Sequence, residues 1–122
     1  MVDGLIDEVI AELAPKLREL LDEVPLVVED RPSPAVMEQM EVADPSDLCG
    51  LYSGIPLTRR SVEHSGQLPD VITIYRQGII ACTGGGGRPR REMLKRQIRR
   101  TILHEIGHHF GLGESDLRRY GY

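Results

Sequence analysis

One long helix near the carboxyl end constrains this chain of 122 residues more than any other feature. The sequence RREMLKRQIRRTILHEIGHHF predicts a helix from about Arg90 to Phe110. Gly111 is expected to end this helix, because glycine readily adopts the left-handed conformation that reverses the chain. A chain of this length fits one domain, residues 1–122, and its core must come from Leu, Ile and Val because it has no Trp and one Phe.

Two further helices are predicted in the first third of the chain. Apolar residues recur at three- and four-residue steps through residues 4–22, with acids between them, which is typical of an amphipathic helix. Pro15 lies inside this segment and is expected to kink the helix or to mark its weak point. Ser33 is placed as an N-cap with Pro34 at the first helical position, so a short helix is predicted there.

Three strands are predicted from short runs of β-branched and apolar residues. They cover residues 24–30, 49–58 and 70–80, and the last of them, DVITIYRQGII, shows the clearest alternation. The segment CTGGGGRPR follows the last strand and contains the four glycines Gly84–Gly87. We expect these glycines to form a mobile connector to the long helix rather than a phosphate-binding loop, because no Gly-Lys-Ser/Thr follows them.

Charge is divided unevenly between the two halves of the chain. Residues 1–50 carry 13 acids and three bases, whereas residues 51–122 carry six acids and 12 bases. Seven of these bases fall between Arg88 and Arg100, where they could follow the phosphates of a nucleic acid. The whole chain is acidic and has few aromatic residues for base stacking. We therefore favour attraction between the two halves within the fold over a nucleic-acid partner.

The sequence also bears on cellular setting and on thiol state. The amino terminus, MVDGLIDEVI, is acidic and amphipathic rather than basic and then apolar, and no apolar run approaches the roughly 20 residues that cross a bilayer. We therefore expect a cytoplasmic protein without a membrane partner. Cys49 and Cys82 belong to no Cys-x-x-Cys motif. Buried free thiols are favoured, with a disulfide as the first alternative and joint metal ligation as the second.

The pentapeptide HEIGH predicts a metal centre near the end of the long helix. His104 and His108 are four residues apart, so both imidazoles lie on one face of the helix, one turn apart, and can bind one zinc ion. Glu105 lies about 100° around the helix, where its carboxylate can reach a metal-bound water and act as general base. His109 points away from His108 and is expected to support the ligands from behind or to pack, rather than to ligate. A helix whose histidines only pack or face solvent is the alternative.

The sequence from LTRRS through VITIYR to RRTILHEIGHHFGLGESDL resembles the minimal zincin-like metallopeptidases, a family of small bacterial one-domain proteins. The motif H-E-x-x-H-x-x-G-x-x followed by a further ligand is the long zinc signature of the metzincin peptidases. The resemblance implies an α+β fold, in which a small mixed β-sheet packs on the active-site helix and an N-terminal helix. It also implies a zinc-dependent peptidase that acts on peptides or small proteins.

Carried over position by position, the resemblance makes His104 and His108 metal ligands, Glu105 the general base and Glu114 the third ligand. The family usually places Asp at the last of these positions. Glutamate is one methylene longer than aspartate but can still ligate zinc. Asp116 lies two residues further on and is the alternative third ligand.

The chain departs from the larger metzincins after the motif. Those proteins continue with a subdomain and a methionine-bearing turn beneath the metal, whereas eight residues follow Glu114 here and no Met follows Met93. We therefore expect either an open site or a site that a second copy of the chain completes in a homo-oligomer. A metal-binding but catalytically inactive interaction module is the alternative function. A peptide substrate is expected to pair with the strand VITIYR or with a strand outside it.

Overall fold

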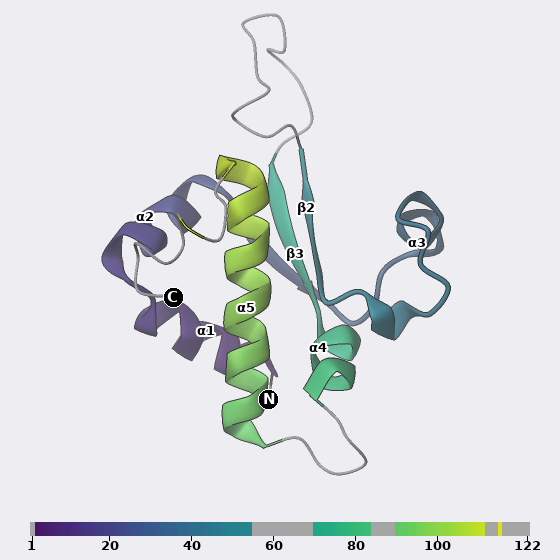
Figure 1. Ribbon diagram of the computed structural model, residues 1–122, viewed down its shortest axis with the longest axis horizontal. Coiled ribbons are helices and arrows are strands. Elements are labelled where there is room, and N and C mark those ends of the chain that lie inside the picture. Colours follow the sequence, from purple (N-terminus) through teal and green to yellow (C-terminus); the bar gives the residue numbers. More distant parts are fainter. Residues whose placement is uncertain (1, 55–69, 84–89, 112–114, 116–122) are drawn as a thin grey trace, which may run out of the picture.

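Helix α5, Arg91–Phe110, lies at the centre of the structure. The structure is a computed structural model, and it describes residues 2–54, 70–83, 90–111 and 115. Figure 1 shows helix α1, Val2–Glu12, on one side of α5 and the β-sheet on the other. Because α5 contacts α1, the sheet and a fourth helix, its second half is buried on most sides. The arrangement confirms the α+β class with an N-terminal helix packed on the long helix.

The long helix ends where the sequence predicts. Gly111 has φ 68° and ψ 27°, which is the left-handed conformation, and its N–H donates a hydrogen bond to the carbonyl oxygen of Gly107. A side chain at this φ would be strained, so glycine is the residue that allows the chain to turn.

Proline divides the first predicted helix into two. Helix α1 ends at Glu12 and helix α2, Pro15–Glu23, begins at the proline itself. Pro15 lacks an N–H and excludes helical geometry from the residue before it, so Ala14 is extended with ψ 142°. The single helix predicted over residues 4–22 is therefore corrected to two. Apolar residues from both helices and from the link between them still line the core: Val2, Leu5, Ile6, Val9, Leu13 and Leu17.

A mixed sheet of three strands packs beside α5. Its order is β1-β3-β2, with β1, Leu26–Glu29, parallel to β3, Val71–Tyr75, and with β2, Gly50–Ser53, antiparallel to β3. Strand β3 is central, and within the described part of the chain β2 forms one edge. The predicted first strand is confirmed in position. Residues 55–58 of the predicted second strand lie outside the described residues, as do Gly84–Gly87 of the predicted connector.

The strand predicted over residues 70–80 is wrong in its second half, where helix α4, Arg76–Thr83, replaces it. Strand β1 ends opposite Tyr75 and β2 begins opposite Ile74, so the ladder offers no further strand partner. A helix satisfies the next backbone groups internally. The pattern misled because a short apolar run does not distinguish a strand from a buried helix.

The remaining elements are short. Helix α3, Pro34–Gln39, begins as predicted, with Ser33 Oγ accepting a hydrogen bond from the N–H of Val36 at 3.2 Å. A 3₁₀ turn, Pro45–Asp47, then leads into β2. None of the helices in the described residues is long and apolar enough to cross a membrane.

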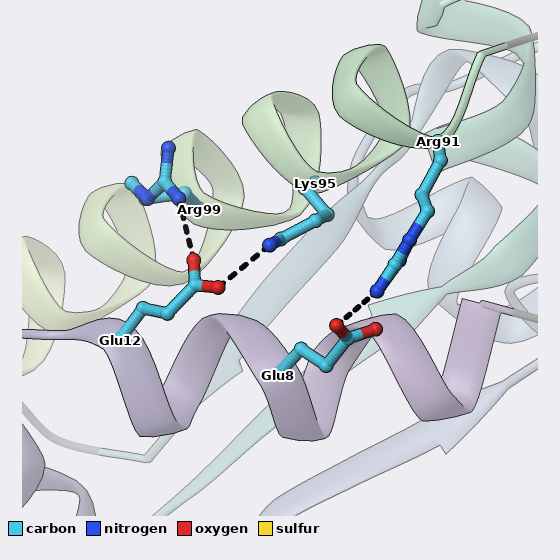
Figure 2. A network of polar contacts seen from close by, with 5 residues as sticks. All are labelled: Glu8, Glu12, Arg91, Lys95 and Arg99. Carbon is cyan, nitrogen blue, oxygen red and sulfur yellow. Dashed lines mark hydrogen bonds and ion pairs between the residues drawn. The ribbon is translucent and has the colours of Figure 1, made fainter.

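The acidic first half and the basic second half of the chain attract each other, as predicted. Arg91 pairs with Glu8, and Glu12 pairs with both Lys95 at 2.7 Å and Arg99 at 3.3 Å, so α1 lies along a basic face of α5 (Figure 2). The Lys95 side chain is only 10% exposed, and a buried ammonium is costly unless a carboxylate accompanies it. Three of the seven bases in the basic segment are thus used inside the fold.

A second set of ion pairs joins α4 to the amino-terminal part of the chain. Arg76 donates from Nε and Nη2 to the two carboxylate oxygens of Asp3, at 2.7 and 2.8 Å, and from Nη1 to Asp30 at 2.8 Å. The hydrogen bond from Arg76 lowers the pKa of Asp3. These pairs fix the start of α4 and the point where β3 ends.

Both cysteines are free, as predicted, but they are not both buried. Cys82 on α4 is exposed, and Cys49, directly before β2, is half-buried. The prediction of burial was wrong because residues 76–83 form a helix with one outward face rather than a strand within the sheet. The two sulfur atoms lie 2.8 Å apart.

Candidate metal centre

The second half of α5 brings His104, Glu105 and His108 together. One possible ligand atom from each residue lies within 4.8 Å of the other two. The two imidazole centroids are 4.4 Å apart, and His108 Nδ1 lies 3.5 Å from Glu105 Oε1. Both imidazoles are exposed, whereas Glu105 is buried. Two accessible nitrogen donors and a nearby carboxylate form a donor set that suits zinc.

An edge strand holds the carboxylate of Glu105. The backbone N–H of Tyr52 donates a hydrogen bond to Glu105 Oε1 at 2.8 Å. This N–H is available because hydrogen-bonded pairs alternate along an antiparallel ladder. The carbonyl oxygen of Cys49 accepts a hydrogen bond from the N–H of Tyr75 in β3, so Cys49 faces β3. Alternate residues along the strand face the same way, so Tyr52, three residues later, turns its N–H away from β3 and toward α5. Burial of Glu105 is therefore compensated by a fixed backbone donor.

A glycine allows α5 to approach β2 closely. A Cβ atom at Gly50 would lie 2.6 Å from Thr101 Cγ2, which is closer than such atoms approach in proteins, and 3.1 Å from the carbonyl oxygen of Thr73, which is a tight contact. It would also lie 3.6 Å from Glu105 Cγ. Glycine leaves room for the Thr101 methyl group at this position, and this close contact brings Glu105 within reach of the backbone of β2.

A buried polar cluster lies beside the candidate metal centre. The Tyr52 hydroxyl donates to Asp70 Oδ1 at 2.8 Å and lies 3.0 Å from His109 Nδ1, which in turn is 3.7 Å from Asp70 Oδ2. The imidazole of His109 packs against the Tyr52 ring, with centroids 5.2 Å apart. This geometry agrees with the predicted packing role of His109. Tyr52 thus contacts Glu105 through its backbone and His109 through its side chain.

Tyr52 and Asp70 were not predicted as site residues; they lie 53 and 35 positions before Glu105. Nothing local marks either residue, because their role depends on the pairing of β2 with β3. Gly54 is the one signal nearby. It has φ 135°, and a Cβ atom there would lie against the Asp70 carboxylate and 3.0 Å from Asp70 Cα. Glycine at this position, directly after β2, therefore allows Asp70 to approach closely.

A cleft of about 540 Å³ opens in front of the three residues. One wall is α5, which presents residues at three- and four-residue steps, and the other is β2 with the turn before it. The metal-ligating candidates thus line a cleft that continues along the helix toward its amino end. The lining residues are Met40, Asp47, Leu48, Cys49, Gly50, Leu51, Tyr52, Gln97, Arg100, Thr101, His104, Glu105 and His108.

Two expectations from the sequence need comment. Glu114 and Asp116, the predicted third ligand and its alternative, lie outside the described residues. Of the predicted strand VITIYR, Val71–Tyr75 form β3 and Arg76 begins α4; β3 is paired on both sides and has no free edge for a peptide. Pairing of a peptide with a strand outside VITIYR stays a prediction.

Comparison with known proteins adds one finding. The sequence model of a family described as zincin-like metallopeptidase matches residues 21–122, which is most of the chain. A search of curated proteins found no match. The matched range contains α5, all three strands and the three clustered residues of the candidate centre.

Proposed function

The chain belongs to the zincin-like metallopeptidase family, and on that premise we propose that it is a zinc-dependent peptidase with Glu105 as its general base. One observation carries the proposal: a buried carboxylate, held by a backbone N–H, lies beside two exposed imidazoles on the same helix. Bound zinc would supply a water of lowered pKa and would polarise a peptide carbonyl. Residues of the chain itself would hold the metal and transfer the proton.

His104 and His108 would hold the ion, since both are exposed to the cleft and one helical turn apart. Glu105 would take a proton from the attacking water and return it to the leaving amine. The Tyr52 N–H holds one carboxylate oxygen, so the carboxylate keeps a constant orientation while it gains and loses the proton. This fixed orientation is a form of preorganisation, because the base need not be ordered during the reaction.

The third ligand is proposed to be Glu114, with Asp116 as the alternative. Alanine substitutions separate the two, since loss of a ligand typically weakens zinc binding strongly while loss of a nearby non-ligand does not. Glu114→Ala is expected to lower zinc affinity by at least tenfold, and Asp116→Ala is expected to leave it nearly unchanged. Competition with a zinc-selective fluorescent chelator measures both. If Asp116→Ala weakens zinc binding and Glu114→Ala does not, Asp116 is the third ligand.

The substrate is proposed to be a peptide or small protein that binds in extended form along β2. Gly50 lies against Thr101 and Tyr52 against Glu105, so β2 and α5 run in the same direction on either side of the cleft. By the alternation described above, the N–H and C=O of Gly50 and the C=O of Tyr52 face away from β3. An added strand would pair with these groups and pass over the histidines.

The deciding experiment compares wild type with Glu105→Gln, which keeps the shape of the side chain but removes its basicity. Both proteins are expected to bind about one zinc per chain, and only the wild type is expected to cleave a broad peptide pool. His104→Ala and His108→Ala are expected to lose the metal. Wild type that binds zinc but cleaves nothing would favour the inactive interaction module. Absence of zinc from the wild type after supplementation would refute the proposal as a whole.

Completion of the cleft by a second copy of the chain remains a prediction. If a partner supplies part of the site, activity per chain falls as protein is diluted below the dissociation constant of the dimer. Sedimentation velocity over the same concentration range shows whether dimers are present. Activity that stays constant per chain, with a monomer throughout, would establish an open site within one chain.

A further inference from the structure

We propose that Cys49 and Cys82 form a reversible modification site, in which a hydroperoxide oxidises the two thiols to an intramolecular disulfide that locks β2 to α4. The two residues are 33 positions apart, yet their Sγ atoms lie 2.8 Å apart as free thiols. The proposal does not depend on peptidase activity, and each of its tests has a readout other than cleavage.

Close packing of α4 on the segment before β2 brings the two cysteines together. Gly78 and Cys82 are four residues apart, so they share one face of α4. A Cβ atom at Gly78 would lie against the carbonyl oxygen of Leu48 and 2.8 Å from Cys49 Cα. The helix backbone therefore touches the chain at Cys49, and one turn later Cys82 meets the Cys49 side chain. Because the contact already exists in the reduced state, a disulfide needs little backbone movement.

The two thiols differ in a way that assigns their roles. Cys82 is exposed, so a hydroperoxide can reach it. Cys49 is half-buried, and burial, followed by the hydrogen bond with Cys82, raises the pKa of its thiol to about 12. At neutral pH the Cys49 thiol therefore stays protonated and is a poor nucleophile toward peroxide. We assign Cys82 as the peroxide-reactive thiol and Cys49 as the resolving thiol.

The reaction balances in two steps. Cys82 as thiolate attacks the peroxide ROOH, which leaves as ROH after proton transfer, and Cys82 becomes a sulfenic acid. The Cys49 sulfur then attacks the Cys82 sulfur, the S–H proton and the sulfenic hydroxyl leave as water, and the S–S bond forms. Two thiols are oxidised by two electrons while the peroxide is reduced. A small thiol or dithiol reductant reverses the change by exchange at the exposed Cys82 sulfur.

The lock would act on a wall of the cleft. Cys49 lines the cleft and directly precedes Gly50, which lies against α5, while Cys82 lines a neighbouring hollow with Thr83 and Arg96. A disulfide would tie the beginning of the edge strand to α4 and close a loop of 33 positions in the unfolded chain. Loops of this size restrict the unfolded state substantially, so the folded state gains stability.

The test treats the purified, reduced, full-length chain with a modest excess of hydrogen peroxide. Mass spectrometry of the intact protein is expected to show a loss of two hydrogens, and a digest without reductant is expected to contain the linked Cys49 and Cys82 peptides. The midpoint of thermal unfolding should rise by about 5 °C or more, and dithiothreitol should reverse both changes. Cys49→Ser and Cys82→Ser serve as matched controls that cannot form the bond.

Three results would overturn the proposal. Oxidation of Cys82 to sulfinic acid with Cys49 still a thiol would show that the pair does not resolve. Disulfides only between chains would show that the contact is not used within one chain. A linked pair without any rise in the unfolding midpoint would remove the locking role. The variant Gly78→Ala adds a geometric test, since its methyl group pushes α4 away from Cys49 and is expected to slow disulfide formation at least tenfold relative to wild type.

Discussion

The backbone N–H of Tyr52 donates to Glu105 Oε1 across 2.8 Å, and this one bond joins the edge strand to the candidate catalytic helix. The same residue contacts His109 and Asp70 through its hydroxyl. Strand and helix are thus held together on both sides of a single tyrosine. Substitutions that separate them should affect the site even where they leave all candidate ligands in place.

Gly50→Ala tests the close approach of β2 and α5. The new methyl group would lie 2.6 Å from Thr101 Cγ2, so we expect overpacking to cost about 1–3 kcal/mol in the free energy of unfolding. Cleavage should fall as well, because Glu105 moves away from the Tyr52 N–H. Gly4→Ala in α1 is the matched control, since no atom lies within 4 Å of the new methyl group and a helical alanine is favourable.

Urea denaturation measures the free energy of unfolding of Gly50→Ala and of the control Gly4→Ala. Thr101→Ser removes the methyl group that the new Cβ would meet, so the double variant Gly50→Ala/Thr101→Ser should regain part of the lost stability. A double variant no more stable than Gly50→Ala would show that the carbonyl oxygen of Thr73, at 3.1 Å, sets the limit instead.

Tyr52→Phe tests the polar cluster beside the candidate centre. It removes the hydroxyl that donates to Asp70 and contacts His109, while the backbone bond to Glu105 remains. We expect a loss of about 1–2 kcal/mol in the free energy of unfolding, because the lost bonds are partly buried. Zinc affinity should change less than threefold. A loss of zinc binding as large as that of His104→Ala would mean that the cluster, rather than the helix alone, orients the ligands.

Glu12→Gln tests the ion pairs between α1 and α5 through pH. The hydrogen bond from Lys95, followed by the charges of Lys95 and Arg99, lowers the pKa of Glu12 below its usual 4.5. A lowered folded-state pKa means that the pair stabilises the fold fully above about pH 4.5 and that this contribution is lost as pH falls through the folded-state pKa. The wild-type unfolding midpoint should therefore drop more steeply below pH 4.5 than that of Glu12→Gln.

The control for this experiment is Glu19→Gln. Glu19 lies 3.8 Å from Lys16, and both side chains are more than half exposed, so its removal should change neither stability nor the pH profile measurably. Thermal scans by circular dichroism between pH 3 and pH 7 follow all three proteins. Superimposable profiles for wild type and Glu12→Gln would show that the two pairs made by Glu12 in Figure 2 contribute nothing in solution.

The reduced protein should lose stability at high pH because of Cys49. Burial raises the pKa of this thiol from 9.0 to about 12, so the folded protein keeps the proton between these values while the unfolded chain loses it. The free energy of unfolding therefore falls as pH rises from about 9 to 12. Cys49→Ser should show a smaller fall over the same range under reducing conditions. Cys82→Ser should retain most of it, since burial is the largest cause of the shift.

The sequence predicts the parts of this protein that are set locally. The carboxyl end of α5 follows from a left-handed glycine, the start of α3 follows from Ser33 and Pro34, and the spacing of His104 and His108 follows from helical geometry. The position of Glu105 relative to the two histidines was also predictable, since all three residues lie on one helix.

Features that depend on pairing between distant segments were not predictable. The change from strand to helix after Tyr75 occurs because the neighbouring strands no longer run alongside, which no property of residues 76–80 reveals. Tyr52 and Asp70 reach the site only through the sheet register. Pro15 was recognised as a weak point, but whether it bends a helix or divides it depends on how the two halves pack.

Helix α1 has a consequence for how the structural unit should be delimited. The family match begins at residue 21, yet α1 ends at Glu12 and supplies the glutamates opposite Arg91, Lys95 and Arg99 together with a row of buried apolar side chains. A fragment cut to the matched range would lack α1 and expose that side of α5. The basic groups of α5 would lose their glutamate partners, and apolar side chains that α1 covers would face solvent. Helix α1 lies outside the range that the family model matches, yet it is part of the packed unit around α5.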